Sequence, residues 1–482
     1  MINFRIIARV FSLLLIVEGF FMLVSAGVSF LYHEHSATSF CYSAFISIVT
    51  GILVFTPFRN EERIFGNKEG YIIVTGIWLI FSIFGTLPFL ISGSITSFGD
   101  AFFESMSGFT TTGATILTNV ESMPHGILFW RSLTQWLGGI GIIFISLSVI
   151  PVFKSFNIQI AAIEFSGQTT DKIHPRIKDA AKRLVGIYLS LTLVEVALLI
   201  IGGMPYFDAI CHSFSTLSTG GFSTRNNGIA TFSTPYIMIV LTVFMFIAGT
   251  NMTLIYFGLK GRFKKLIGNN EFVFYSLICF IFVALVSLIL YFKSGFPFGK
   301  ALLDSAFHVI SIISTTGFYT QDHNLWGNII LIIFFILMFT GGTSGSTAGG
   351  IKIVRLLLIT KNTRQELKRL IHPNAFIPVR LDNRIISQNT IYNLLVFIIL
   401  YFFVMCLGTF IISFMGYDII TSFSTSASML GNIGPGLRTF GPFTNYSALP
   451  MAGKWFLSVM MLLGRLELLT VMILFSKNFY RN

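Results

Sequence analysis

Four short strings rich in threonine or glycine recur along the sequence, each between a short and a long apolar segment. They are Thr111-Thr112-Gly113, Thr219-Gly220-Gly221, Thr315-Thr316-Gly317 and Asn432-Ile433-Gly434. Glycine adopts positive φ without steric cost, so such strings can turn successive carbonyl oxygens toward one axis. Rings of backbone carbonyls can replace the hydration shell of a monovalent cation. Together the four strings predict an ion pathway.

Aspartates precede the strings at a regular distance. In the first three strings the last glycine lies 13 residues after Asp100, Asp208 or Asp304, and Asp418 lies 16 residues before Gly434. We expect each aspartate to cap a short re-entrant helix, where its charge suits the helix N-terminus. Four residues on, one helical turn away, the first three aspartates are followed by Glu104, His212 and His308. An acidic outer funnel that concentrates cations is one interpretation; capping with local hydrogen bonds is the favoured one.

Glycine turns at helix ends are the alternative explanation for any single string, since many helices end that way. Four copies with a shared upstream aspartate favour a selectivity filter instead. Carbonyl and hydroxyl oxygens bind hard cations, and the strings contain no carboxylate, so a monovalent ion fits them better than calcium.

A glycine-rich segment interrupts the apolar stretch 326–359. It consists of Gly341, Gly342, Thr343, Ser344, Gly345, Ser346, Thr347, Ala348, Gly349 and Gly350. Its five glycines each disfavour helix by about 1 kcal/mol relative to alanine. We expect a helix break and a mobile loop that gates the pathway. A close helix contact through G-x-x-x-G spacing is the alternative, whereas a phosphate-binding loop lacks its G-K-[ST] ending.

Two ionisable groups stand within apolar spans. Arg465 lies in Gly464-Arg465-Leu466-Glu467 near the middle of the last span. Burying a charge there costs at least about 2.5–3.5 kcal/mol, so Arg465 is expected either to oppose cations beneath the filter or to pair with a group on another helix. Glu467 is too close along the helix to be that partner. Glu195 in another span remains open between a functional and a hydrogen-bonding role.

The elements that must position these residues are apolar helices. The chain has 482 residues, of which 54% are hydrophobic and 11% charged, with a mean hydropathy of +0.79. Ten stretches approach the length of about 20 residues that crosses a bilayer: 6–32, 39–57, 71–94, 126–151, 180–203, 234–258, 271–292, 326–359, 388–415 and 453–476. The first is too long for a cleavable signal. This predicts an all-α membrane protein.

The spans group into repeats. We expect two N-terminal transmembrane helices in 1–66, and helix–pore-loop–helix modules in 67–152, 153–260, 261–370 and 371–482. The third module has a broken second helix, and the four modules are expected to stand in a pseudo-fourfold arrangement. Each half-crossing from aspartate to string is about 20 Å of helix, so it is re-entrant and must be covered by protein or water.

The net charge of +12 reflects orientation and not nucleic-acid binding. Basic residues concentrate in the segments on one side of the spans, which the positive-inside rule places in the cytoplasm with both termini. All four strings then lie on the outer side. The basic segments 157–183 and 361–384 are surface stretches that could dock a cytosolic partner, and basic loops attract anionic lipid in general. The four cysteines and the histidines show no metal or disulfide spacing.

The strings SMSGFTTTGAT, STLSTGGFST, ISTTGF, GGTSGSTAGGIK and LGRLELLT resemble those of the Trk/Ktr/HKT superfamily of potassium transporters, most closely its TrkH membrane subunits. The two extra N-terminal spans are similar too. The resemblance implies potassium uptake across a bacterial inner membrane, a homodimer, and a cytosolic TrkA-like nucleotide-binding regulatory ring. It implies that Gly113, Gly221, Gly317 and Gly434 are filter glycines, that 341–350 is the gate and that Arg465 is a barrier beside it. The fourth string departs by lacking threonine.

Two rival functions remain. A proton- or sodium-coupled potassium symporter built from broken helices would be expected to show inverted repeats, whereas these modules run in one direction. A membrane-embedded enzyme would use Glu195, His212 or His308, but no nucleophile or paired carboxylates accompany them. We therefore expect no enzymatic activity, and potassium as the transported ion without a further cofactor.

Overall fold

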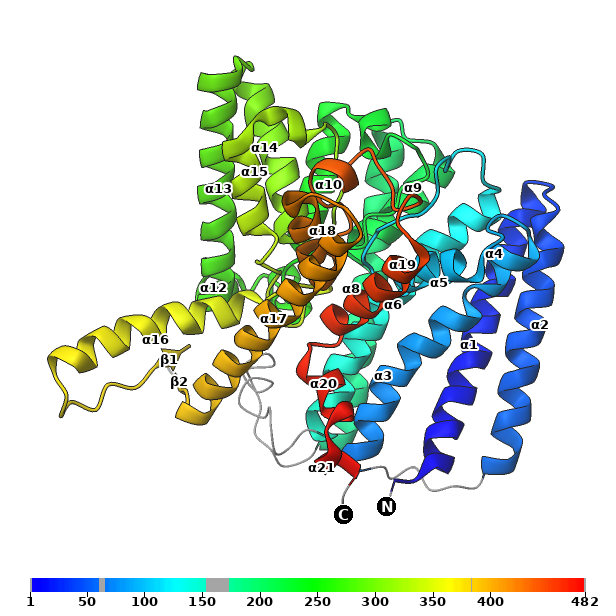
Figure 1. Cartoon of the computed structure of the whole chain (residues 1–482), viewed down its shortest axis with the longest axis horizontal. Helices are drawn as coiled ribbons and strands as arrows, with labels where there is room; N and C mark the ends of the chain where they lie inside the picture. Colours follow the sequence, from blue (N-terminus) through cyan, green and yellow to red (C-terminus); the bar gives the residue numbers. More distant parts are fainter. Residues whose placement is uncertain (1, 60–65, 153–172, 383, 481–482) are drawn as a thin grey trace.

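The structure, a computed structural model, describes the whole chain except residues 1, 60–65, 153–172, 383 and 481–482. The described part is almost entirely helical. It opens with a hairpin of α1 (Phe4–Leu31) and α2 (Ser36–Phe55), extended by the short helix η1 (Thr56–Phe58), which stands at one side of the molecule (Figure 1). The Asn3 side chain caps α1 by accepting from the N–H groups of Arg5 and Ile6.

Four times the chain then repeats a long helix, a short helix, a string and another helix. The first unit has α3 (Asn67–Phe84), α4 (Leu87–Ile91), α5 (Phe98–Phe109) and α6 (His125–Val152). The second has α8 (Ile173–Ile201), α9 (Tyr206–Leu217), η2 (Gly228–Phe232), α10 (Pro235–Ala248), α11 (Met252–Leu259) and α12 (Phe263–Ile267). The third has α13 (Asn270–Ser294), α14 (Phe298–Ile313), η3 (His323–Trp326), α15 (Asn328–Leu337) and α16 (Ile353–Ile371). The fourth has α17 (Gln388–Phe414), α18 (Ile419–Gly431), η4 (Arg438–Phe440), α19 (Met451–Arg465), α20 (Leu469–Met472), η5 (Ile473–Phe475) and α21 (Lys477–Tyr480).

Six helices in the described part are long and apolar enough to cross a membrane, or up to eight if each bent pair counts as one span. Each of the apolar stretches 234–258 and 453–476 contains one of these bends. α10 and α11 meet at 114°, and α19 meets the segment Leu469–Phe475 at 108°. The break expected in 326–359 is present, because α15 ends at Leu337 and α16 begins at Ile353.

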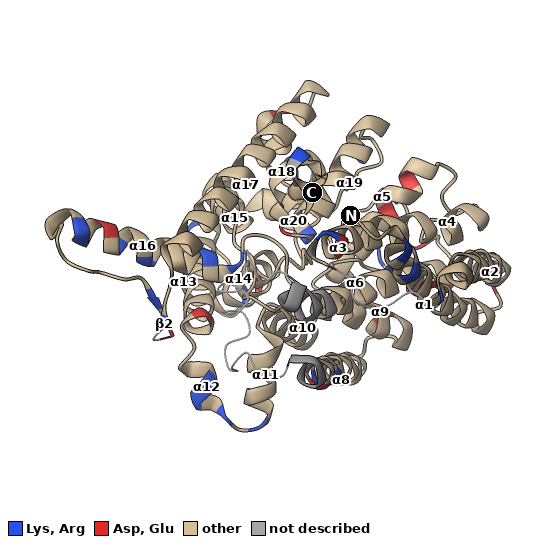
Figure 2. Ribbon diagram, turned by 90° about the horizontal axis from the view of Figure 1, so that it is seen from below, with Lys and Arg blue, Asp and Glu red and all other residues tan. Residues whose placement is uncertain are grey.

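Both chain ends lie at the same end of the molecule, and α16 projects sideways from the body of packed helices (Figure 1). Seen from that end, Lys and Arg segments stand out on α12 and α16 (Figure 2). β1 (Arg380–Leu381) and β2 (Arg384–Ile385) form a small antiparallel pair. The first part of α16 packs on the segment that follows this pair, around Val354, Leu358 and Leu394. Most of the basic segment 157–183 lies outside the described residues.

Candidate functional site

Each string follows the C-terminal end of a short, buried helix. The helices are α5, α9, α14 and α18. In every string the first and third residues have positive φ and the middle residue does not: φ is 52° for Thr111 and 81° for Gly113, and 54° for Asn432 and 99° for Gly434. The left-handed region costs a threonine or asparagine on the order of 1–3 kcal/mol. The alternating handedness expected from the sequence is thus built into all four strings.

The four strings contact one another in a closed cycle. A Cβ placed on the last glycine of any string would come within 3.0 Å of the middle carbonyl oxygen of the next string: Gly113 against Gly220, Gly221 against Thr316, Gly317 against Ile433, and Gly434 against Thr112. Real Cβ atoms essentially never come so close. The cycle passes from the first string through the second, third and fourth and returns to the first, so the strings form a ring that only glycine allows.

Oxygen atoms also gather at the start of the strings. Thr111 Oγ1 and Asn432 Oδ1 are buried and have no hydrogen-bond partner within the described part of the chain. Asn432 Nδ2 donates to Thr112 Oγ1 at 3.0 Å, which joins the fourth string to the first. Buried polar atoms normally have a partner, so these two oxygens keep unused acceptor capacity at the start of the first and fourth strings.

The aspartates tie the short helices to other segments, and only one of them is a cap. Asp418 caps α18 by accepting from Thr421 N at 3.3 Å. The expected capping is wrong for the other three, because α5, α9 and α14 begin earlier, after Ser97, Pro205 and Pro297. The partners of the carboxylates are Lys454 at 2.7 Å for Asp100, Arg225 at 2.7 Å for Asp208, Gln321 at 2.8 Å for Asp304 and Arg438 at 3.5 Å for Asp418.

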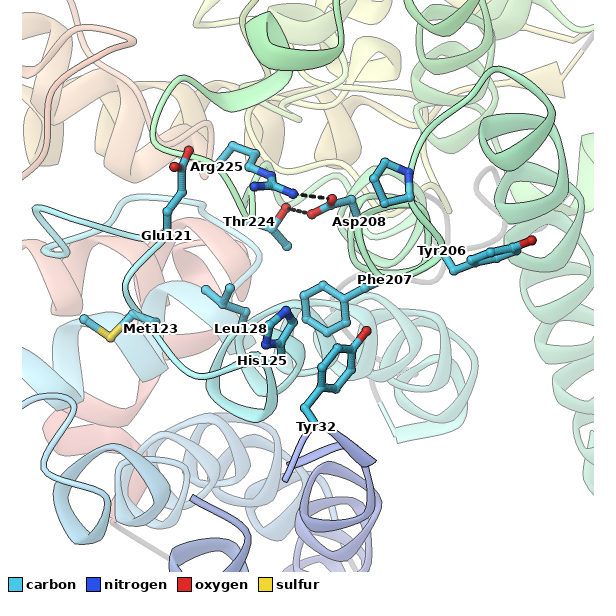
Figure 3. Close-up of a pocket in the computed structure, with 11 residues that line it drawn as sticks. Tyr32, Glu121, Met123, His125, Leu128, Tyr206, Phe207, Asp208, Thr224 and Arg225 are labelled. Carbon is cyan, nitrogen blue, oxygen red and sulfur yellow. Dashed lines mark hydrogen bonds and ion pairs between the residues drawn. The ribbon is translucent and has the colours of Figure 1, made fainter. Parts of the chain in front are cut away.

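The second of these tethers borders a surface pocket of about 300 Å³. Asp208 faces Arg225 and Thr224 from one side, while the stacked rings of Tyr32 and His125 line the other (Figure 3). The pocket thus lies between the N-terminal hairpin, the first unit and the second unit. None of the string residues lines it.

The residues one turn after the aspartates support the chain beyond each string, and they do not form an open acidic funnel. Glu104 is buried and accepts from Ile116 N at 2.9 Å and from Arg131 Nε at 2.8 Å. The ring of His212 contacts Ser223 Oγ at 2.9 Å, and His308 Nε2 accepts from Thr320 N at 3.4 Å. Local hydrogen bonding, the interpretation favoured from the sequence, therefore accounts for Glu104, His212 and His308.

The segment 341–350 is a buried loop against the start of the strings. Gly349 N donates to Thr315 Oγ1, the first residue of the third string, at 2.7 Å. Thr347 Oγ1 donates to Leu217 O, at the end of α9, at 3.0 Å. A Cβ on Gly349 would collide with Gly431 O at the end of α18. The loop thus reaches the second, third and fourth units just below their strings.

The guanidinium of Arg465 links this loop to α6. Its Nη1 donates to Thr347 O at 2.7 Å, and its Nη2 donates to Gly138 O on α6 at 3.2 Å. Within the described residues Arg465 has no acidic partner, so the expected alternative of an ion pair does not describe it. Glu467 instead pairs with Arg355, just after the loop. The guanidinium is thereby placed between α6 and the loop.

Two further residues, which sequence reasoning missed, hydrogen-bond to the same loop. Asn251 Nδ2 donates to Ser344 O at 2.6 Å, and Glu271 Oε1 accepts from Ser344 N at 2.6 Å. Both side chains are buried. We call Asn251 and Glu271 the Ser344 clamp. A lone carboxylate in the first turn of an apolar helix was the available signal for Glu271.

Glu195 is fully buried, and Cys211 and Cys279 are buried free thiols. Within the residues that the structure describes, no group of three or more His, Cys, Asp and Glu side chains could hold a metal ion.

Long apolar helices around short buried helices and a ring of glycine-containing strings define the class: a nearly all-helical, multi-pass membrane protein. The sequence model of the TrkH family, described as "Cation transport protein", matches residues 36–481. The chain therefore belongs to the TrkH family.

Relatives match along their whole length. The chain is 35% identical to the Trk system potassium uptake protein TrkH of Salmonella typhimurium, covering 99% of this chain and 100% of that one. It is 30% identical to TrkG of Escherichia coli, covering 99% of each. The crystal structure of the potassium transporter TrkH from Vibrio parahaemolyticus superposes with a TM-score of 0.91 at 33% identity and covers 100% of both chains.

Proposed function

We propose that this protein takes up potassium across the bacterial inner membrane through the ring of strings, in the manner of a channel, and that the loop 341–350 gates it. The observation that carries the proposal is the closed cycle of contacts between the four glycines and the neighbouring carbonyls. Such a ring presents carbonyl oxygen from four sides, which suits a dehydrated monovalent cation. The names of the relatives as potassium uptake proteins agree with it.

The residues proposed to bind potassium are those of the four strings. Their alternating handedness allows consecutive carbonyls to face the ring, and the orphaned Thr111 and Asn432 oxygens supply further ligands. The short helices direct their C-terminal ends, which carry about half a negative charge, toward the space below. This arrangement lowers the cost of holding a cation in the membrane.

The proposed gate works by occlusion. The loop is fixed beneath the strings by Thr315, Leu217 and Arg465, and the buried guanidinium adds a positive charge that opposes cations there. Opening requires the loop to leave these contacts. Arg355, near the start of α16, pairs with Glu467 in the bend between α19 and α20. Because α16 follows the loop in the chain, a movement of α16 would displace both the loop and this bend.

The surroundings follow from this proposal. Both termini face the cytoplasm, where basic residues prevail, and the strings face outward. We propose that the protein is a homodimer in the lipid bilayer and that a cytosolic TrkA-like nucleotide-binding ring regulates it. The projecting helix α16 (Figure 1) is a surface that the regulatory ring could bind, and because α16 follows the loop in the chain, its movement would move the loop.

Flux from reconstituted vesicles tests the function. Uptake of radioactive potassium and sodium is measured with and without an imposed membrane potential, for wild type and for Gly113→Ser and Gly434→Ser. Each serine would place a Cβ against a carbonyl of the ring and adds about 1–2 kcal/mol of backbone strain. We expect both variants to lose potassium preference over sodium. Unchanged selectivity would refute the filter, and uptake that needs a proton or sodium gradient would favour the symporter.

A further inference from the structure

The middle position of the strings differs in the second unit. Thr112, Thr316 and Ile433 carry side chains there, whereas Gly220 does not. The two threonine hydroxyls make the same contact: Thr112 Oγ1 lies 2.8 Å from Thr110 Oγ1, and Thr316 Oγ1 lies 2.8 Å from Ser314 Oγ. Each middle hydroxyl is therefore fixed by a hydroxyl two residues earlier. The second string lacks this support although Ser218 stands at the corresponding place.

A side chain from the first unit fills the space. Gln135 on α6 is fully buried, and a Cβ built on Gly220 would lie within 3.0 Å of its Cδ, Oε1 and Nε2 atoms. Gln135 Nε2 donates to Gly220 O at 2.7 Å, and its Oε1 accepts from Phe222 N at 3.2 Å. The one amide thus holds the backbone on both sides of Gly221.

Two consecutive glycines are otherwise the least restrained part of the ring. Glycine reaches φ values of either sign, so the peptide between Gly220 and Gly221 could rotate and withdraw its carbonyl. That carbonyl oxygen is the one that Gly113 packs against. A rotated peptide would remove one oxygen from the ring and loosen the contact between the first and second strings.

We propose that Gln135 is a positioning residue that substitutes, from the neighbouring unit, for the missing side chain at position 220 and thereby sets the preference for potassium over sodium. The proposal rests on the proposed function of the strings. Selectivity requires the oxygens to keep their spacing when a smaller ion enters, since a ring that can rearrange fits sodium as well. Gln135 supplies that restraint at the one string that has no side chain at its middle position.

Gln135→Glu isolates the donor. Glutamate keeps the shape and an oxygen for Phe222 N but cannot, when ionised, donate to Gly220 O. We expect the ratio of potassium to sodium uptake, measured per folded protein in the membrane, to fall roughly two- to tenfold, the size of one net hydrogen bond. Gln388→Glu, the same chemical change on an exposed side chain at the start of α17, is the matched control and should keep the wild-type ratio.

Exchange of the two side chains provides the sharper test. Gly220→Thr alone should abolish selective uptake, because its Cβ collides with Gln135. Adding Gln135→Ala vacates the space and places a hydroxyl two residues after Ser218, as in the first and third strings. The double variant should regain the potassium preference that Gly220→Thr loses. Gln135→Ala alone, which leaves both glycines of the string unsupported, should keep a lowered potassium-to-sodium ratio; a wild-type ratio in that single variant would show that Gln135 serves only to pack α6.

Gly113→Ser in the same vesicles separates failure of this proposal from failure of the filter. If Gly113→Ser lowers the potassium-to-sodium ratio but Gln135→Glu does not, the role of Gln135 is refuted and the filter stands. If neither variant changes the ratio, both the filter and the role of Gln135 are refuted. A double variant that is no more selective than Gly220→Thr also overturns the proposal, even where Gln135→Glu folds poorly.

Discussion

Loosening the Ser344 clamp should open the pathway at rest. Glu271→Leu removes the carboxylate that accepts from Ser344 N, and Asn251→Asp removes the amide that donates to Ser344 O. Asn251 also caps α11 by accepting from Thr253 N at 2.8 Å. Aspartate retains that acceptor, so the substitution affects the loop without removing the cap.

The magnitude follows from the two hydrogen bonds. A buried bond to a charged group contributes about 1.5–3 kcal/mol and a neutral one about 0.5–1.5 kcal/mol. Only the part present in the closed state and absent in the open state shifts the equilibrium. Because about 1.4 kcal/mol corresponds to a factor of ten, Glu271→Leu should raise the resting open fraction about ten- to hundredfold. Asn251→Asp should raise it about two- to tenfold.

Rubidium tracer uptake into potassium-loaded vesicles, without any regulatory partner, measures this resting leak. Glu271→Gln is the matched control, since its amide oxygen can still accept from Ser344 N, and its leak should stay closest to wild type. A loop deletion in the same preparation marks full opening. Wild-type leak rates for both Glu271→Leu and Asn251→Asp, beside a leaking deletion, would show that the clamp does not hold a gate.

Three further outcomes are expected. Deleting Thr343 to Ala348 should leave the pathway permanently leaky in the same flux assay, because the occluding backbone is gone. Glu104→Ala should lower the free energy of unfolding by about 3–5 kcal/mol, because it leaves Arg131 as an unpaired buried charge; the unfolding temperature in detergent reports it. Burial raises the pKa of Glu34, but hydrogen bonds from His125 and Gly126 outweigh burial and hold the pKa below 4.5. The folded protein therefore gains stability from the ionised carboxylate, and wild type should lose that stability as pH falls below 4.5. Glu34→Gln, which has no carboxylate to protonate at this position, should lose less.

Each outcome has a result that contradicts it. Loss of all transport by a deletion variant that still folds would remove the gate assignment. For Glu104→Ala, the matched control is Glu121→Ala at an exposed position, and equal unfolding temperatures for the two would show that the buried pair contributes nothing. For Glu34, identical slopes of stability against pH in wild type and Glu34→Gln would contradict the lowered pKa.

Helix positions were predictable from sequence because bilayer crossing demands long apolar runs, and those runs are plain. The bends were not. The break between α10 and α11 occupies only Gly249, Thr250 and Asn251. Hydropathy averaged over a whole span changes little when only three residues leave the helix. Its cause is also distant, since Asn251 bonds Ser344 of the loop. A bend stabilised by tertiary contacts has little local signal.

The strings were predictable because positive φ restricts residue type locally and the pattern repeats. The supports behind them were not, because they join positions remote in sequence. Lys454 and Asp100 are 354 residues apart, and Glu104 reaches Arg131 on another helix. The aspartates are regularly spaced in the sequence, but spacing alone does not distinguish a helix cap from a tether to the segment beyond the string.

Unlike copies of one unit make a single gate possible. Counted from the first residues of α6, α10, α15 and α19, the fifteenth position holds Gly139, Gly249, Gly342 and Arg465. The residue before it packs against the end of a short helix in the first and fourth units, where Cβ atoms on Gly138 and Gly464 would meet Phe109 O and Leu430 O. Three units thus carry no side chain at this fifteenth position, and the fourth places a guanidinium beneath the strings.

The loop of the third unit, which itself contains Gly342, lies beneath the strings, bonded to Gly249 O through Thr343 N at 2.8 Å and to Arg465 through Thr347 O. Four identical subunits would bring four loops and four arginines to one axis, where they would collide and repel each other. A single chain that diverged into four units supplies one of each. Glycine at the corresponding place in the first two units serves packing between units, because a Cβ on Gly139 would meet Tyr188 Oη and Ser218 and a Cβ on Gly249 would meet Tyr275 Oη. A larger side chain at either position would therefore push the next unit away from the helix that carries it.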